Sequence, residues 1–210
     1  MIWGAIGQAV VLSEFAAQIG LSILALVDND EELSSPLAGV PLLRGAAGLE
    51  RWLAQAGGAQ PMGAIVAVGG ARGSVRMELA ASMQAMGLQS VDAVHPAAYV
   101  ATDATCGAGL QVMAGAVVGA RARLGQQCLI NTGATVDHEC QLDDGVHVGP
   151  GASLAGCVRV GRHSFVGTGA VVLPRIQIGS DVVVGAGAVV TRDLPDGVVV
   201  VGNPARVLRK

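Results

Sequence analysis

His138 has the neighbours of a general base, because it lies between two acids in the run Asp137-His138-Glu139. A carboxylate bonded to one imidazole nitrogen fixes the tautomer and makes the other nitrogen a better proton acceptor. Gly156 follows eighteen residues later, and its backbone N–H is open to an oxyanion because it has no side chain. A base beside such an N–H suits acyl transfer. The alternative for His138 is a solvated surface histidine.

The other histidines and one asparagine carry weaker signals. His147 is expected on a flat outer face, as a structural or merely exposed residue, and His163 is expected at the surface. His95 precedes a proline, so we expect it to pack at a joint in the chain. The amide of Asn131 could bind a ligand hydroxyl or the imidazole of His138.

A zinc site is the competing chemistry for these histidines. His138, His147 and His163 are enough in number for the three-histidine zinc site of γ-carbonic anhydrases. Their spacing is not that of the γ-carbonic anhydrases, and the acids beside His138 suit a base better than a metal ligand. We therefore expect no metal.

A strict six-residue period organises the second half of the chain. From Val100 to Val190, every sixth residue is Val, Leu, Ile or, once, Cys, and the slot four residues later is usually small. This period suits hexapeptide repeats that wind into a parallel β-helix, in which three repeats close one triangular coil. Residues eighteen apart then stack, so Ala120, His138 and Gly156 should share one corner. Small neighbours above and below His138 leave room there for a substrate.

Composition limits the classes of function. The 210 residues are 51% hydrophobic but only 2% aromatic, and the net charge is −3. A negative net charge does not favour binding to the phosphates of nucleic acid. No apolar run is typical of a membrane span. We expect no signal peptide, because the start lacks a basic region. Three of the four cysteines, Cys106, Cys128 and Cys140, fall in core-facing slots, which predicts buried thiols and a cytoplasmic protein.

The first 95 residues predict a small α/β domain with a Rossmann-like parallel sheet. We expect strands at 1–4, 23–27, 64–68 and 90–94, and helices at 8–19 and 72–86. Ligands of such sheets bind at the carboxyl ends of the strands, where Asp28 and Asn29 follow the second strand. The β-helix should then occupy 96–194, and 195–210 should form a tail that packs on it.

The chain resembles a known family in INTGATVDHECQLDDGVHVGPGASLAGCVRVG, VGTGAVVLPRIQIGSDVVVGAGAVVTRDLP and VGNPAR. These stretches are similar to the bacterial sugar O/N-acyltransferases, which include sialic acid O-acetyltransferases and nucleotide-linked amino-sugar N-acetyltransferases. The resemblance implies that the β-helix is left-handed. It also implies acetyl-CoA as co-substrate, and a homotrimer with its active sites between subunits.

The resemblance also implies residue roles. It makes His138 the base and Glu139 the acid that orients it, with Asp137 as the other candidate and a substrate contact. Gly156 would hold the oxyanion and His147 would contact the thioester end of acetyl-CoA. The related turns VGTG and VGAG place Thr168 and Ala186 on the pantetheine arm.

The nucleotide-sugar site of the resemblance falls in the α/β domain, where the chain departs from the family pattern. The glycine-rich loop reads Gly4-Ala5-Ile6-Gly7-Gln8, so one glycine and the family's histidine are replaced, and the later strand ends in Gly69-Gly70. The residues assigned to the substrate are Gly4, Gly7, Gln8, Asp28, Asn29, Gly69, Asn131 and Asp137.

The predicted function is acetyl-CoA-dependent N-acetylation of a nucleotide-linked 4-amino-sugar in the synthesis of bacterial surface glycans, with His138 as base in direct transfer. O-acetylation of sialic acid or another sugar is the alternative. A zinc-dependent hydratase and a non-catalytic scaffold are more remote alternatives.

Overall fold

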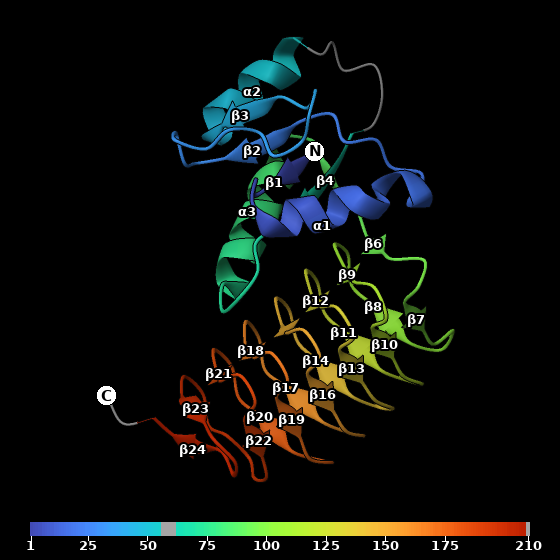
Figure 1. Cartoon of the computed structure of the whole chain (residues 1–210), viewed down its shortest axis with the longest axis vertical. Coiled ribbons are helices and arrows are strands. Elements are labelled where there is room, and N and C mark those ends of the chain that lie inside the picture. The colour runs from blue at the N-terminus through green and yellow to red at the C-terminus, as the bar shows by residue number, and fades with distance from the viewer. Residues whose placement is uncertain (56–61, 209–210) are drawn as a thin grey trace.

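The computed structural model describes residues 1–55 and 62–208, and it has an α/β domain resting on a triangular prism of short strands (Figure 1). No helix in these ranges is long and apolar enough to cross a membrane. The predicted fold class is confirmed in both parts.

The α/β domain has a five-stranded parallel sheet in the order β3-β2-β1-β4-β5. Its elements are β1 (Ile2–Trp3), α1 (Gly7–Phe15), the 3-10 helix η1 (Ala16–Ile19), β2 (Leu26–Asp28), β3 (Leu42–Arg44), α2 (Gly45–Gln55), β4 (Gly63–Val66), α3 (Gly73–Ala85) and β5 (Gln89–Ser90). The strand β3 and the helix α2 are not in the sequence prediction.

The prism has three faces, and in each face the successive strands from β6 to β22 lie eighteen residues apart. The docked face, on which the α/β domain lies, contains β6 (Ala93–Val94), β9 (Gln111–Val112), β12 (Leu129–Ile130), β15 (His147–Val148), β18 (Phe165–Val166), β21 (Val183–Val184), β23 (Val199–Val201) and β24 (Arg206–Val207). The open face contains β7 (Tyr99–Val100), β10 (Val117–Val118), β13 (Thr135–Val136), β16 (Ser153–Leu154), β19 (Val171–Val172) and β22 (Val189–Val190). The third face contains β8 (Thr105–Cys106), β11 (Arg123–Leu124), β14 (Gln141–Leu142), β17 (Arg159–Val160) and β20 (Gln177–Ile178).

The six-residue track forms the core of the prism. Its side chains from Val112 to Val190 are buried together with the small residues of the second slot. Each coil pairs in parallel with the next, for example Val118 with Val136 and Val136 with Leu154. No coil can bury its apolar face alone, so the stack is stable only as an array.

The border between the two parts differs from the prediction. The expected strand at 90–94 is two strands, because β5 pairs with β4 of the α/β sheet whereas β6 pairs with β9 of the prism. The prism therefore begins at Ala93, three residues before Pro96. At the other end, β23 pairs with β21 and β24 folds back on β23, so residues 195–208 extend the docked face, and residues 209–210 lie outside the described residues.

Cys106 is exposed, contrary to the prediction of a buried thiol. It faces the core from β8, but β8 is the first strand of the third face, so no coil covers it from above. Cys128 and Cys140 are buried and Cys157 is half-buried, and all four thiols are free.

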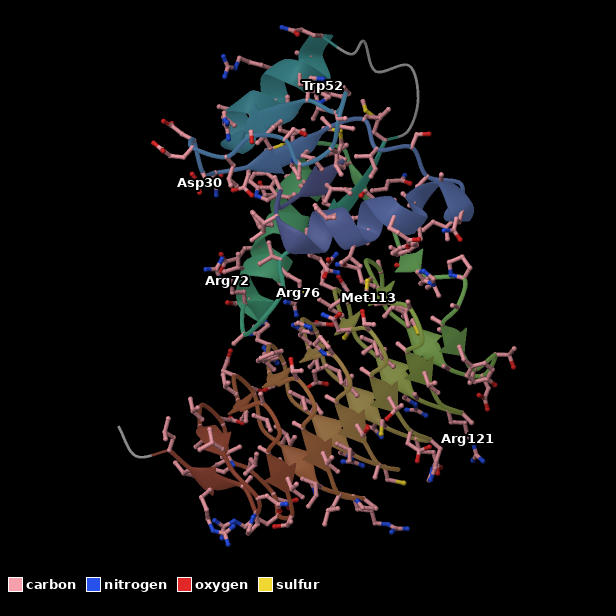
Figure 2. All side chains as sticks on the ribbon, in the orientation of Figure 1. Asp30, Trp52, Arg72, Arg76, Met113 and Arg121 are labelled. Carbon is pink, nitrogen blue, oxygen red and sulfur yellow. The ribbon has the colours of Figure 1, made fainter. Side chains whose placement is uncertain are left out.

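The α/β domain is fixed to the docked face by apolar and polar contacts. Leu12 and Phe15 of α1 belong to one buried cluster with Met113 and Leu129 of the prism. Arg76 of α3 is fully buried, and its guanidinium donates to the carbonyl oxygens of Val68, Gln127 and Gly145. Figure 2 shows Arg76 and Met113 between the two parts of the molecule. Arg76 therefore joins the end of the β4 segment to two turns of the prism.

Candidate active site

His138 lies in the turn between β13 and β14, at the corner where the open face meets the third face. Its Nδ1 is 3.2 Å from Oε2 of Glu139. A carboxylate only accepts, so Nδ1 carries the proton and Nε2 keeps its lone pair. The imidazole is half-exposed, and the edge that carries Nε2 and Cε1 lies next to Gly156.

Asp137 has a different contact from Glu139. Its Oδ1 accepts a hydrogen bond of 2.7 Å from the backbone N–H of His138. Of the two candidate acids, Glu139 is therefore the one that contacts the ring, while Asp137 stabilises the turn that presents it.

Gly156 is the vertical neighbour of His138 in the next coil. A Cβ built on Gly156 would overlap Nε2 of His138, so only glycine leaves the imidazole its position. In the described residues, the N–H of Gly156 donates to no protein acceptor. A free N–H beside the lone pair of a base is the arrangement that acyl transfer requires.

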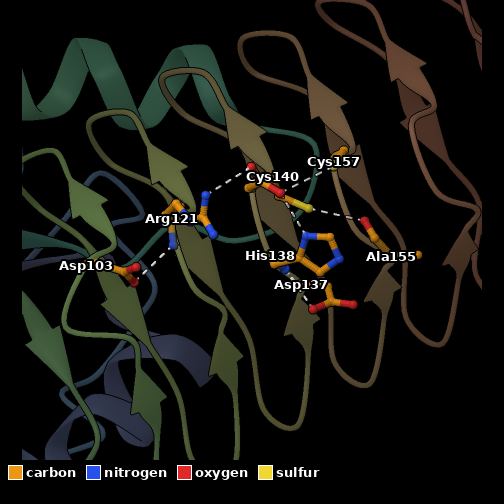
Figure 3. Close-up of polar contacts among 8 residues, drawn as sticks. Asp103, Arg121, Asp137, His138, Cys140, Ala155 and Cys157 are labelled. Carbon is orange, nitrogen blue, oxygen red and sulfur yellow. Dashed lines mark hydrogen bonds and ion pairs between the residues drawn. The ribbon is translucent and has the colours of Figure 1, made fainter.

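A column of side chains eighteen residues apart runs along the same corner. Arg121, Glu139, Cys157 and Arg175 all have a positive φ, between 57° and 63°, and we call them the corner column. Nη1 of Arg121 is 3.7 Å from Oε1 of Glu139, and Sγ of Cys157 is 3.9 Å from Oε2 of Glu139 (Figure 3). Arg121 and Cys157 are not among the site residues predicted from the sequence, although each lies one coil of eighteen residues from Glu139.

A second candidate region is a cavity of about 880 Å³ between the α/β domain and the docked face. Seven of the eight residues predicted to contact the substrate line it, together with His147: Gly4, Gly7, Gln8, Asp28, Asn29, Gly69 and Asn131. The eighth, Asp137, is on the corner of His138. The cavity lies at the carboxyl ends of β1, β2 and β4, as expected for an open parallel sheet.

Asp28 holds the loops around this cavity in place. Its carboxylate accepts hydrogen bonds from the N–H groups of Ala5, at 2.8 Å, and Asp30, at 3.0 Å. Gly4 has a φ of 105°, and a Cβ there would lie 2.6 Å from the carbonyl oxygen of Ala67. The loop before α1 can therefore pass this close to the end of β4 only with glycine at position 4.

Gln8 binds to the prism. Its Nε2 donates to Oε1 of Gln111 at 3.2 Å, and Nε2 of Gln111 donates to the carbonyl oxygen of Val66. The side chain at position 8 thus lines the cavity and also joins the α/β domain to the docked face.

His147 is only 3% exposed, because the α/β domain covers the outer face of β15. Of the two expectations for His147, structural or merely exposed, this burial agrees with the structural one. Its Nδ1 lies 3.3 Å from the carbonyl oxygen of Gly70, and its Nε2 lies 3.1 Å from Nδ2 of Asn131. The amide of Asn131 thus contacts His147 and not His138. Burial, helped by the charge of Arg76, lowers the pKa of His147 to about 4.

The remaining histidines are structural in this geometry. His95 stacks on Phe15 with ring centroids 4.8 Å apart, which confirms its packing at the joint. His163 is half-buried, and its Nδ1 is 3.2 Å from Asp181. His138, His147 and His163 lie on different sides of the prism, and both ring nitrogens of His147 have partners, so one copy of the chain does not assemble a three-histidine zinc site.

The turns assigned to acetyl-CoA lie in a third region, away from both the His138 corner and the cavity. Thr168 follows β18 and Ala186 follows β21, so both are at the corner between the docked face and the open face. The base is at the other edge of the open face, whereas the cavity is on the docked face. One copy of the chain therefore does not bring the predicted base, acetyl-CoA turns and substrate cavity together.

The open face carries exposed apolar side chains between these two corners. Tyr99, Val117, Val171 and Leu173 are all exposed. A shallow groove of about 410 Å³ on this face is lined by Thr135, Asp137 and Ser153, among others. An apolar face of this kind is typical of a protein contact surface.

Comparisons with known proteins agree with this architecture. The family model described as bacterial transferase hexapeptide (six repeats) matches residues 157–192. A variant of perosamine N-acetyltransferase from Caulobacter crescentus, solved with CoA and GDP-perosamine, is 37% identical with a TM-score of 0.91, and the match covers 100% of this chain and 96% of that one.

Two further solved structures match over nearly the full length. The acetyltransferase domain of PglB from Neisseria gonorrhoeae FA1090, solved with acetyl coenzyme A, is 37% identical with a TM-score of 0.85, covering 99% of this chain and 97% of that one. WeeI from Acinetobacter baumannii AYE is 27% identical with a TM-score of 0.81, covering 99% and 98%. A search of curated protein sequences gave no match.

Proposed function

This chain belongs to the bacterial sugar acyltransferases with a left-handed β-helix of hexapeptide repeats, and from that premise we propose that it N-acetylates a nucleotide-linked 4-amino-sugar with acetyl-CoA. The proposal rests on one observation: the hydrogen bond between His138 and Glu139, with the ring of His138 next to Gly156, which has no side chain. The solved relative with GDP-perosamine, a nucleotide-linked amino-sugar, supports the choice of acceptor.

The proposed reaction is a direct transfer. The amine of the sugar attacks the thioester carbonyl, and Nε2 of His138 takes the proton that the amine loses. Glu139 holds Nδ1–H, and the N–H of Gly156 stabilises the negative charge that develops on the carbonyl oxygen. The C–S bond then breaks and CoA leaves as the thiol, taking up the proton. General base catalysis of this kind contributes roughly 10²–10⁴-fold to the rate.

The interdomain cavity is the proposed site of the nucleotide-sugar. The helix α1 begins at Gly7 on the cavity wall, and N–H groups at the start of a helix favour phosphate. Arg72 also lines the cavity and brings a positive charge for the diphosphate. Asp28 and Asn29 lie at the carboxyl end of β2, where they support contacts to the ribose or the base.

We also propose that the active enzyme is a homotrimer. The separation of His138 from the cavity within one copy supports a site shared by two subunits, and the apolar open face supports a contact between prisms. The turns at Thr168 and Ala186 would bind the pantetheine arm along the same contact, and His147 would stand near the thioester. Four free thiols support a cytoplasmic location.

The deciding experiment incubates the purified protein and acetyl-CoA with a panel of nucleotide-linked 4-amino-sugars and with free sialic acid, and measures the released CoA thiol. We expect release with at least one amino-sugar and its loss in His138→Ala. Turnover of sialic acid alone would overturn the amine acceptor in favour of O-acetylation.

A further inference from the structure

The proposed base shares its corner with a second set of chemical groups. A ring nitrogen of His138, a carboxylate oxygen of Glu139 and Sγ of Cys157 lie within 4.8 Å of one another. The imidazole and the carboxylate are half-exposed, and Cys157 is half-buried. In the proposed transfer reaction, His138 is the base and Glu139 orients it, whereas the thiol of Cys157 has no role.

These three atoms have the composition and spacing of zinc ligands. Bonds of about 2.0–2.1 Å in a tetrahedral site place nitrogen and oxygen ligands about 3.3 Å apart. Nδ1 of His138 and Oε2 of Glu139 are 3.2 Å apart, and Oε2 and Sγ are 3.9 Å apart. A small movement of exposed side chains is enough to bring all three onto one ion, with a fourth position left for water or another thiolate.

The backbone supports this arrangement. Cys157 has a φ of 62°, in register with Glu139 at 60°, so the 18-residue repeat presents both side chains outward in adjacent layers. The N–H of Cys157 donates to the carbonyl oxygen of His138 at 2.9 Å, which fixes the two coils relative to each other.

We propose that His138, Glu139 and Cys157 form a site for a thiophilic divalent cation such as Zn²⁺, and that the bound ion blocks acetyl transfer. The site is distinct from a catalytic metal centre, because the proposed reaction needs no ion. The inhibitory part rests on the proposed function, whereas binding of the ion does not.

The block follows from the tautomer of the imidazole. The ion takes the lone pair of Nδ1, so the single proton of the neutral ring must reside on Nε2. A protonated Nε2 cannot accept the proton of the attacking amine. The ion also takes Glu139 away from the ring, and the thiol proton of Cys157 is released to solvent.

The metal-binding test uses the full chain and Co²⁺ as an optical probe. We expect an absorption band from thiolate-to-cobalt charge transfer, which Zn²⁺ removes and Mg²⁺ does not, because Mg²⁺ prefers oxygen ligands. Cys157→Ala should lose the band, and Cys106→Ala, which removes the exposed thiol outside the site, should keep it. No band in the unaltered protein, or an equal band in Cys157→Ala, would overturn the site.

The inhibition test measures acetyl transfer at increasing Zn²⁺. We expect inhibition that a chelator reverses, normal metal-free activity in Cys157→Ala, and half-inhibition of this variant at no less than about tenfold more Zn²⁺. Equal inhibition of Cys157→Ala and Cys106→Ala would overturn the blocking role. If no amino-sugar is acetylated, the proposed function fails, and the cobalt titration still decides whether the site exists.

Discussion

His147 is a neutral imidazole held between two fixed partners. The carbonyl oxygen of Gly70 requires a proton on Nδ1, and the amide N–H of Asn131 requires a lone pair on Nε2. A second proton on the ring would face the donor Asn131 and would have to be buried with its charge. The site thus favours the neutral form, which agrees with the lowered pKa.

This burial predicts a dependence of stability on pH. The ordinary pKa of 6.5 applies to the unfolded chain and the value of about 4 to the folded one. As pH falls from 6.5 to 4, the unfolded chain binds a proton that the folded chain refuses, so the free energy of unfolding should fall by about 3 kcal/mol from this group. Urea denaturation at pH 7 and pH 4 measures this change. His147→Gln should flatten the dependence and His163→Gln should not; equal curves for both variants would contradict the assignment.

Gly156 predicts a sharp effect of a single methyl group. The Cβ of Gly156→Ala would overlap Nε2 of His138 and push the imidazole from its position. A misplacement of about 1 Å can lower the rate by about 10²-fold. We therefore expect acetyl transfer to fall by that order while the melting temperature changes little, since the half-exposed imidazole can move toward solvent. Steady-state kinetics together with thermal denaturation test this, and an active Gly156→Ala would remove the glycine from the mechanism.

Among the elements, α3 depends on Arg76 for its attachment to the prism. The guanidinium satisfies three carbonyl oxygens, and burial lowers its pKa to about 10, so it remains charged at neutral pH. Arg76→Leu would leave these acceptors buried without donors, and each such loss costs about 1–3 kcal/mol. We expect a loss of at least about 3 kcal/mol in the free energy of unfolding.

The measurement for Arg76 is a urea titration beside a matched surface variant. Arg123→Ala removes an arginine from an exposed position on β11 and should leave the midpoint unchanged. A midpoint in Arg76→Leu equal to that of Arg123→Ala would show that the interdomain hydrogen bonds add nothing to stability.

The sequence predicted those elements that show a regular pattern of apolar residues within a short stretch of chain. The track of every sixth residue located the prism strands, because one buried side chain per hexapeptide is a property of each repeat. The apolar runs near Leu26 and Ile65 located β2 and β4 for the same reason. By contrast, β3 is three half-buried residues without such a signal, and it is defined by pairing with β2.

Parts of the site were beyond the reach of the sequence because they depend on contacts between distant elements. The burial of His147 results from docking of the α/β domain, and no periodicity of β15 reports that contact. Likewise, the exposure of Cys106 depends on which strand ends a sheet. The column of Arg121, Glu139 and Cys157, in contrast, follows from the sequence, because the 18-residue spacing that stacks Ala120, His138 and Gly156 also stacks the residue after each of them.

At the scale of the whole molecule, the separation of base and cavity predicts complementation between subunits. His138→Ala removes the base, and Gly7→Leu fills the cavity at a position where a Cβ meets no neighbour within 4 Å. Each variant should be inactive alone. Mixed oligomers should recover part of the activity, since a trimer then contains intact bases beside intact cavities from different subunits.

Co-expression of the two variants with different affinity tags, followed by tandem purification, isolates the mixed oligomers for this assay. Sedimentation should give a mass of three 21.0 kDa chains. Recovery of activity supports the shared site, whereas mixed trimers as inactive as either parent would place base and cavity in the same subunit.

The stacking of Gly156 beneath His138 also limits how the gene can change in length. The two residues meet only because the chain between them makes one full circuit of the prism, so an in-frame insertion of a single codon in that circuit would rotate every later side chain away from its partner. Beyond Arg175, a whole coil could be added or lost without disturbing this contact. Length variation among descendants of this sequence should therefore come in complete coils and lie on the far side of the reacting layer.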